Sequence, residues 1–257
     1  MRLYFFCIEK HIFAKIFQNL NLIIRVLMAR RRKKKQSEDT LVDLVEVKDS
    51  ASDFLEENQM TIIGVLAAVI LVIGGYIFYN QFIQAPKEKD AAAQIVQAQA
   101  MFEKDSFALA LTNPGGGFMG FLDIIEDYGG TKIANTAHYY AGISYLQLGQ
   151  YDAAIDYLGS FDSEGTVLAY TKYGAIGDAY AEKNDFDNAL SFYDKAANAG
   201  ENEVLASYYL KKVGLLHEKQ GQFAAAKEAF EKIKNDYPSS QEGTDIDKYI
   251  ARVASKG

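Results

Sequence analysis

The sequence predicts an all-α protein in which a single membrane-spanning helix precedes an α-solenoid of stacked helical hairpins. Three observations lead to this prediction. The second half repeats one hairpin pattern three times, at residues 148–158, 183–193 and 220–230. Residues 58–86 contain no charged side chain. The chain has only three prolines but 17 tyrosines and 16 phenylalanines, a composition suited to packed helices.

Residues 1–27 are rich in Phe, Ile, Leu, Asn and Lys, and Met28 follows them in the setting of an ordinary start. We interpret 1–27 as translated upstream sequence and Met28 as the natural start. The alternative is a helix on a membrane surface, because apolar residues fall near one face: Ile12, Ile16, Leu20, Ile23 and Ile24. Residues 28–57 then form an arm that is basic at 30–35 and acidic beyond.

Residues 58–83 are predicted to form the transmembrane helix. The segment 60–79 supplies about the 20 apolar residues that a bilayer core requires, and Tyr76 and Tyr79 lie where aromatic rings favour the interface. A buried core helix is disfavoured because such helices are rarely uncharged for so long. A cleaved signal peptide is disfavoured because the segment starts late and is too long.

The basic run at 30–35 sets the predicted orientation. Lys and Arg near a span stay in the cytoplasm, and the far side opens with only Lys87 and Lys89. The N-terminus is therefore predicted to be cytoplasmic and the repeat domain to lie outside, in the periplasm. The reverse topology, with a cytosolic repeat domain, stays open as an alternative.

Residues 87–132 are predicted to form a degenerate first repeat. An alanine-rich helix over 87–106 is followed by a glycine loop at 114–117. The segment FLDIIEDYGGT at 121–131 then parallels FEKIKNDYPSS at 230–240. The helical hairpin would therefore have a loop inserted at its turn.

Residues 133–257 are predicted to hold three near-full repeats and a capping helix at 241–254. Each copy has an aromatic residue, an alanine three positions later and a bulky residue four further on, and the copies lie 35 and 37 residues apart. The three triplets are Tyr151, Ala154 and Leu158; Phe186, Ala189 and Tyr193; and Phe223, Ala226 and Phe230. A unit of this length cannot bury its apolar face alone, so copies stack.

The first helix of each hairpin carries a small residue three positions before a larger one. Small side chains let two helices approach closely, and the larger ones fill the space beside them. The pairs are Gly142 and Tyr145, Gly177 and Tyr180, and Gly214 and His217. Gly149, Asn184 and Gly221 are predicted to end the first helices because they accept positive φ, and Pro238 is predicted to stop the last second helix.

This pattern resembles the tetratricopeptide repeat from about residue 135 to residue 238. The resemblance implies a right-handed superhelix whose inner surface comes from the first helices. Spacing then places on that concave face the residues Thr136, Tyr139, Ile143, Leu146, Thr171, Gly174, Asp178, Ala181, Tyr208, Lys211, Leu215 and Glu218. Such a lining suits an extended or helical peptide. The alternative is that several of these residues pack against a neighbouring helix.

Nothing in the sequence predicts catalysis, a cofactor or a metal. His11 lies in the leader, and His138 and His217 are predicted to be packed core histidines. Cys7 has no plausible partner, and the glycine motifs lack the spacing of phosphate or dinucleotide sites. Residues 87–257 carry a net charge of −9, which disfavours a nucleic-acid partner. We also expect no small-molecule substrate.

The architecture resembles the family of bacterial inner-membrane proteins described as the ancillary subunit of the SecYEG translocon, particularly its Bacteroidetes-like members. The residues that carry the resemblance are FLEENQ (54–59), DYGGT (127–131), AHYYAGISYLQLGQYDAAIDYL (137–158) and AIGDAYAEKNDFDNAL (175–190). It implies a non-enzymatic, chaperone-like adaptor whose partners are translocon subunits or extracytoplasmic client proteins. A scaffold for envelope assembly or cell division, with the same fold, is the competing interpretation.

Overall fold

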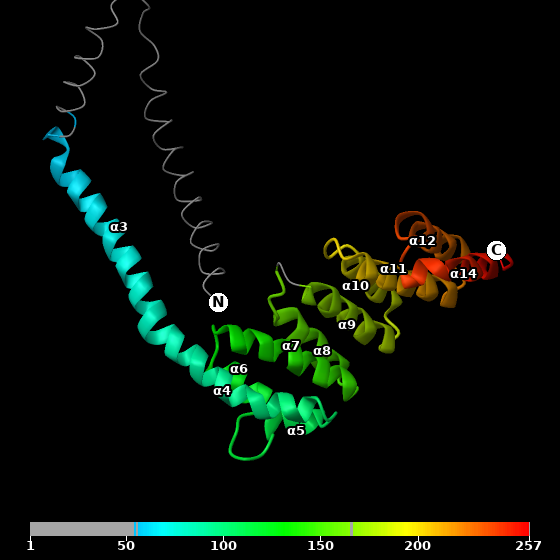
Figure 1. The fold of residues 1–257 in the computed structure, drawn as a ribbon, viewed down its shortest axis with the longest axis horizontal. Helices are drawn as coiled ribbons and strands as arrows, with labels where there is room; N and C mark the ends of the chain where they lie inside the picture. Colours follow the sequence, from blue (N-terminus) through cyan, green and yellow to red (C-terminus); the bar gives the residue numbers. More distant parts are fainter. Residues whose placement is uncertain (1–53, 55, 165–166, 257) are drawn as a thin grey trace, which may run out of the picture. The chain divides into compact units, whose positions relative to one another are not determined.

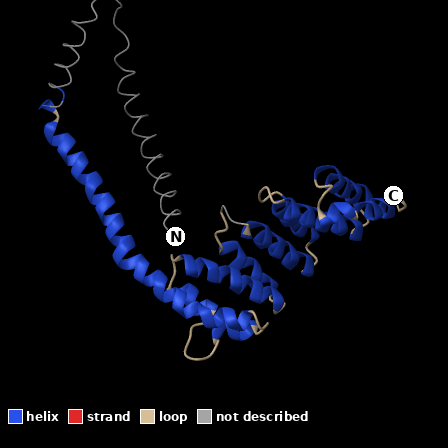
Figure 2. Ribbon diagram, in the orientation of Figure 1, coloured by secondary structure: helices blue, strands red, loops and turns tan. Residues whose placement is uncertain are grey.

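The computed structural model describes residues 54, 56–164 and 167–256. The described chain is helical, and Figure 2 shows helices and loops but no strand in this part. The all-α prediction is therefore confirmed. The predictions for the leader 1–27, for Met28 as the start and for the basic run 30–35 lie outside the described residues. The chain divides into two units, Met1–Val72 and Ile73–Gly257.

Helix α3, Gln59–Tyr79, is the apolar helix of the predicted span (Figure 1). Its 21 residues rise about 31 Å at 1.5 Å per residue, enough for a hydrocarbon core of about 30 Å. None of its side chains is buried. It contains the only stretch in the described part of the chain that is long and apolar enough to cross a membrane.

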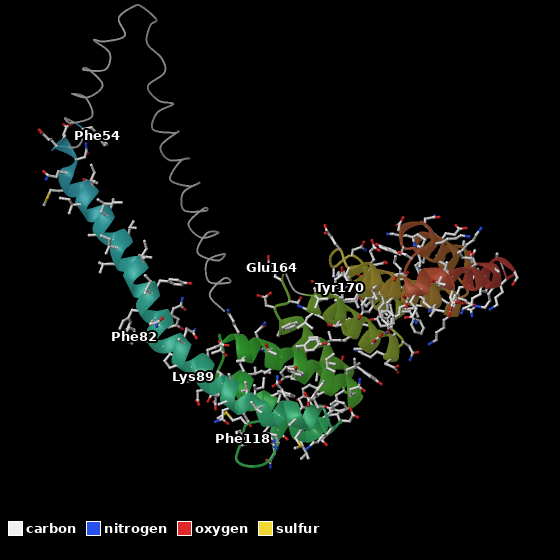
Figure 3. The ribbon with its side chains drawn as sticks, viewed as in Figure 1. Phe54, Phe82, Lys89, Phe118, Glu164 and Tyr170 are labelled. Atoms are coloured by element: carbon white, nitrogen blue, oxygen red, sulfur yellow. The ribbon has the colours of Figure 1, made fainter. Side chains whose placement is uncertain are left out.

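A π-helical turn, η1 (Asn80–Gln84), joins α3 to α4 (Ala85–Phe102). The sequence suggested a separate helix over 87–106, but helical structure continues from Gln59 to Phe102. Pro86 explains the wider turn, because proline donates no N–H and its ring crowds the preceding turn. Phe82, labelled in Figure 3, is exposed and stacks on Phe78 with ring centroids 4.8 Å apart.

Helix α4 ends at Phe102, four residues before the predicted end at 106. Asp105 adopts a positive φ of 56°, and the next helix starts directly afterwards. This helix, α5 (Phe107–Thr112), is separated from α6 (Phe121–Asp127) by the predicted glycine loop. All three loop glycines at 115–117 have positive φ, which only glycine adopts freely.

Three helical hairpins follow. They are α7 (Lys132–Gln147) with α8 (Tyr151–Ser160), α9 (Leu168–Glu182) with α10 (Phe186–Ala197), and α11 (Glu203–Lys219) with α12 (Phe223–Asp236). The predicted turn residues Gly149, Asn184 and Gly221 have φ of 72°, 60° and 75°. Helix α12 ends two residues before Pro238. The turn and stop predictions are confirmed.

The capping segment is two helices, α13 (Gln241–Thr244) and α14 (Ile246–Ala254). The prediction of one helix over 241–254 was wrong in this respect. Asp245 leaves helical geometry with φ −106° and ψ 2°. A Cβ on Gly243 would lie 2.2 Å from the Tyr237 carbonyl oxygen, so α13 is held tightly against the end of α12.

The buried core of the second unit falls into separate clusters. One is centred on α4 to α7 and includes Phe121 and Ile124, whereas another is formed by α9 to α12 with α14 and includes Phe230 and Ile233. A smaller cluster joins Leu158 of α8 to Ala175 and Ile176 of α9. This segmentation is typical of a stack in which each hairpin contacts its neighbours.

Candidate peptide-binding surface of the helical repeats

The three hairpins close through one repeated contact. A Cβ added to Gly142, Gly177 or Gly214 would lie 2.5, 2.6 and 2.3 Å from the side chain of the bulky residue in the second helix. Those partners are Leu158, Tyr193 and Phe230. The alanines of the pattern, Ala154, Ala189 and Ala226, are fully buried. The small residues thus allow close contact between the two helices of each hairpin. This contact sets the rotation of the first helix, and so the direction of its opposite face, which is the predicted groove face.

The larger residues of the first helices lie beside this contact. The Tyr145 ring stacks on Tyr157 with centroids 5.2 Å apart, and Tyr180 stacks on Phe192 at 5.5 Å. His217 differs: it is only half-buried, and its Nδ1 lies 2.6 Å from Gln222 Oε1. The imidazole of His217 is polar and is satisfied by this hydrogen bond to Gln222, so burial in the apolar core is not required.

His138 is also half-buried instead of being a core residue. Its ring lies 5.9 Å from that of Tyr157, and its Nδ1 is buried with no hydrogen-bond partner. Desolvation lowers the pKa of His138, because burial disfavours the charged imidazolium. The prediction of two core histidines was therefore wrong for the degree of burial of both.

In α7 the predicted groove residues Thr136, Tyr139, Ile143 and Leu146 are all half-buried. Ile143 and Leu146 pack against the cluster around Leu158. The Tyr139 hydroxyl donates to Thr171 Oγ1 in α9 at 3.3 Å. This part of the surface is therefore partly used to join neighbouring first helices.

In α9 the predicted groove residues separate into packing and polar positions. Gly174 is buried, and a Cβ there would lie 2.1 Å from the Tyr209 ring, so it is a packing position. Ala181 packs on the core of the later hairpins. Asp178 accepts hydrogen bonds of 2.6 Å from the Tyr193 hydroxyl and from Lys212 Nζ. Burial, with the nearby Asp178 carboxylate, raises the pKa of Tyr193.

In α11 the predicted groove residues are the most accessible. Tyr208 is 42% exposed and Leu215 is 37% exposed. Lys211 places its ammonium 5.1 Å from the centroid of the Tyr249 ring in α14. The structure therefore brings part of the predicted surface together as an accessible face on α11, whereas the matching positions of α7 and α9 are more covered.

Glu218 lies at the end of this face and pairs with α14. It accepts hydrogen bonds from Arg252 Nη2 at 2.5 Å and from Lys256 Nζ at 3.1 Å. Burial alone would raise the pKa of Glu218, but the two cationic donors outweigh it and lower the pKa. These residues, with Leu215 and Lys219, line an open cavity of about 410 Å³, which we name the exit pocket.

Sequence reasoning missed Lys212, Lys219, Arg252 and Lys256 as parts of this surface. Arg252 could have been found from the strongly amphipathic pattern of the capping helix, in which it lies off the face of the buried Ile246 and Val253, whereas Lys256 lies beyond the end of that helix. The Lys212 partner could not be found this way, because Asp178 lies 34 residues away in another helix.

The DYGGT segment has a structural role at the other end of the repeats. The Tyr128 hydroxyl donates to Asp90 in α4 at 2.6 Å, and Thr131 caps α7 by accepting from the Ala134 N–H at 3.0 Å. The carboxylate of Glu88 accepts from the N–H groups of Lys132 and Ile133 at 2.8 and 3.1 Å. These N–H groups have no partner within the helix. We name this set of contacts the α4 joint.

In the described part of the chain, no group of three or more His, Cys, Asp or Glu side chains could hold a metal ion. Among the described residues, the charged contacts around the predicted groove include the pairs of Asp178 with Lys212 and of Glu218 with Arg252 and Lys256. What the arrangement offers is therefore a surface of apolar and charged side chains on stacked first helices.

Models of the tetratricopeptide repeat family match residues 136–163, 173–199 and 212–240. These stretches follow the three hairpins formed by α7 to α12, so the chain carries tetratricopeptide repeats, as the sequence predicted. Such repeats are generally non-catalytic scaffolds that mediate binding to other proteins. Comparison with curated proteins found no match, and comparison with solved structures found none either.

Proposed function

We propose that this chain is a non-enzymatic scaffold for protein–protein interaction, anchored in the bacterial inner membrane by α3. The observation that carries the proposal is the combination of three tetratricopeptide hairpins with a 21-residue apolar helix that has no buried residue. An apolar helix of this length that is exposed all round would be costly in water. A bilayer removes that cost.

The proposed orientation places the arm 28–57 in the cytoplasm and the repeats in the periplasm. Support comes from the six consecutive basic residues at 30–35, against only Lys87 and Lys89 after the span. Protease added to spheroplasts should digest the repeats while the inner membrane is intact. Resistance of the repeats until detergent is added would instead indicate the reverse topology.

We propose that α4 to α6 form a degenerate first repeat, within residues 87–132. Phe121 and Ile124 in α6 are fully buried, as are Phe230 and Ile233 in α12. Helix α4 would be the first helix of that repeat, and residues 133–257 would then hold the three regular repeats and the cap. The sequence predicted the glycine loop at the turn of this hairpin, but the loop follows the short helix α5, so in this proposal α5 and α6 together stand for the second helix.

We further propose that the scaffold is a chaperone-like adaptor near the protein translocon that contacts envelope proteins. This rests on the resemblance carried by FLEENQ, DYGGT and the two hairpin segments. The proposed concave face comprises the accessible groove residues in α7, α9 and α11, with Gly174 excluded because Tyr209 covers it.

The test is site-specific photo-crosslinking in native membranes. A photoreactive residue replaces Tyr208, on the accessible face, and in a matched control replaces Lys232, which is exposed on α12. We expect translocon subunits or emerging envelope proteins to crosslink at position 208 and not at 232. Crosslinks at 208 to division or outer-membrane assembly proteins alone would favour the alternative scaffold, and equal labelling at both positions would contradict the proposed face.

A further inference from the structure

The exit pocket is basic in an acidic domain. Its lining contains three cations, Lys219, Arg252 and Lys256, and a single acid, Glu218, whereas residues 87–257 as a whole carry a net charge of −9. Such a local excess of positive charge attracts anionic groups to the pocket, although the domain as a whole is acidic.

Glu218 does not compete with an incoming carboxylate. Its side chain is 11% exposed, and its two oxygens are occupied by Arg252 and Lys256. The two cations are 44% and 48% exposed, so each can donate further hydrogen bonds outward. Arg and Lys make their strongest hydrogen bonds to carboxylates. Glu218 thus holds the two cations in place at the rim of the pocket.

Lys219 adds a third cation from the end of α11. It is exposed and makes no ion pair with any described carboxylate. Its ammonium lies 4.9 Å from the centroid of the Phe186 ring. A cation that rests on an aromatic face keeps its charge available for a second partner.

An apolar strip on α11 leads into this pocket. Val204, Tyr208 and Leu215 are exposed, and they follow one face of the helix at spacings of four and seven. Leu215 is also part of the pocket lining. Leu215 therefore joins the strip to the pocket, and Lys211 lies between Tyr208 and Leu215 on the same face of α11.

We propose that the exit pocket and the α11 strip bind an acidic peptide segment of a partner protein. An aspartate or glutamate lies among Lys219, Arg252 and Lys256, and a neighbouring apolar side chain packs on Leu215 and Tyr208. Charge complementarity selects this occupant over a basic or purely apolar peptide. The proposal rests on the proposed scaffold function and names the chemistry of the ligand.

The test uses the full chain in micelles of an uncharged detergent and a fluorescein-labelled ten-residue peptide of alternating Glu and Leu. Anisotropy is compared with that of the same peptide carrying Gln in place of Glu. The acidic peptide is expected to bind about tenfold more tightly, the change that about 1.4 kcal/mol produces. Its affinity should fall as salt rises, since rim charges are screened.

Two pocket variants and one control locate the binding. Lys219→Glu breaks no ion pair, so it should keep the fold, and it should weaken the acidic peptide about tenfold. Leu215→Gln should weaken the acidic and the neutral peptide alike. Lys232→Glu makes the same charge change on exposed α12 and should leave both affinities unchanged. Circular dichroism checks that each variant is folded.

Equal affinity for the acidic and neutral peptides, or no effect of Lys219→Glu, would overturn the proposal. Phosphatidylglycerol vesicles are added as competitors of the labelled peptide. If they displace it at a lower concentration than the unlabelled acidic peptide does, the pocket is a lipid site and the proposal is also overturned. If crosslinking at Tyr208 still captures partners while Lys219→Glu changes neither peptide nor partner capture, the scaffold function stands and this proposal fails.

Discussion

The two ends of the repeat array are closed by helices with opposite chemistry. At the first end, acids on α4 bind groups that carry no formal charge: Glu88 accepts from two backbone N–H groups, and Asp90 accepts from the Tyr128 hydroxyl. At the last end, Arg252 of α14 and Lys256, just beyond the end of α14, each pair with one oxygen of the Glu218 carboxylate.

The difference shows how a capping helix can also set the charge of the surface beside it. The α4 joint places the Glu88 carboxylate on the N-terminus of α7, where the helix dipole favours a negative charge, and the Asp90 carboxylate accepts from the Tyr128 hydroxyl. The α14 end brings two cations to one acid and leaves positive charge in excess. The first end is therefore mainly a structural closure, whereas the last end carries the excess positive charge on which the proposed peptide binding rests.

The largest predicted effect comes from Phe121→Ala and Phe230→Ala, one at each end. Both rings are fully buried, Phe121 stacking on Tyr140 at 5.2 Å and Phe230 lying 5.5 Å from Tyr249. Each change should cost about 3–5 kcal/mol. Hydrogen exchange should rise in α4 to α7 for the first variant and in α9 to α12 and α14 for the second, because the two cores are separate. Equal loss of protection at both ends in either variant would contradict independent ends.

Gly177→Leu in the middle hairpin is a reference that involves neither end. Its Cβ would lie 2.6 Å from the Tyr193 ring, and overpacking should cost about 1–3 kcal/mol. Gly159→Ala in α8 is the control, because nothing lies within 4 Å of its Cβ; it should stabilise by a few tenths to about 1 kcal/mol. Urea unfolding followed by circular dichroism measures both. An unchanged midpoint for Gly177→Leu would mean that the hairpin contact is wrong.

Tyr128→Phe probes the α4 joint. Loss of the hydrogen bond to Asp90 should cost about 1 kcal/mol at neutral pH. That bond, with a smaller effect of burial, raises the pKa of Tyr128 to about 12 from 10.0. The folded-state pKa is the higher one, so the stabilisation is present below pH 10 and is lost between pH 10 and 12.

The measurement is the difference in unfolding free energy between the parent chain and Tyr128→Phe across that pH range. It should shrink towards zero by about pH 12. Tyr140→Phe is the control for removing a tyrosine hydroxyl from the same core, since the Tyr140 hydroxyl makes no side-chain hydrogen bond with described residues. A Tyr128→Phe difference that is constant with pH would exclude the proposed role of the hydroxyl.

The smallest effect is predicted for Lys234→Ala at the last end. Lys234 pairs with Asp247 of α14 at 2.7 Å, but the two side chains are 53% and 74% exposed. Exposed pairs contribute about 0.2–1 kcal/mol, and 1 M salt should remove the difference. If Lys234→Ala lowered the unfolding free energy by more than Tyr128→Phe, and salt did not change this loss, the α14 end and not the α4 joint would be the structurally stronger closure.

The features that the sequence predicted correctly are local ones. The hairpin turns depend on residues that accept positive φ, and the close helix contact depends on a small residue facing a bulky one within about 16 residues. Both can be inferred from spacing alone. The apolar helix is likewise visible in composition.

The features that the sequence did not predict depend on how one repeat lies on the next. Gly174 has the spacing of a groove residue, but the Tyr209 ring of the next hairpin covers it. Helix α4 continues from the span because the π turn accommodates Pro86, and the cap breaks at Asp245 because Gly243 is held against α12. The exit pocket needs α14 to approach α11, which no periodicity shows.

The α4 joint also has a consequence for the order in which the chain folds. The hydrogen bonds that α4 makes in this joint link residues 38 to 45 positions apart, whereas each hairpin turn joins residues only a few positions apart. During synthesis α4 can complete its contacts only once the start of α7 has emerged, about 45 residues later. Each later hairpin can then add to a closed first layer, and exposed apolar surface at any moment is limited to about one hairpin.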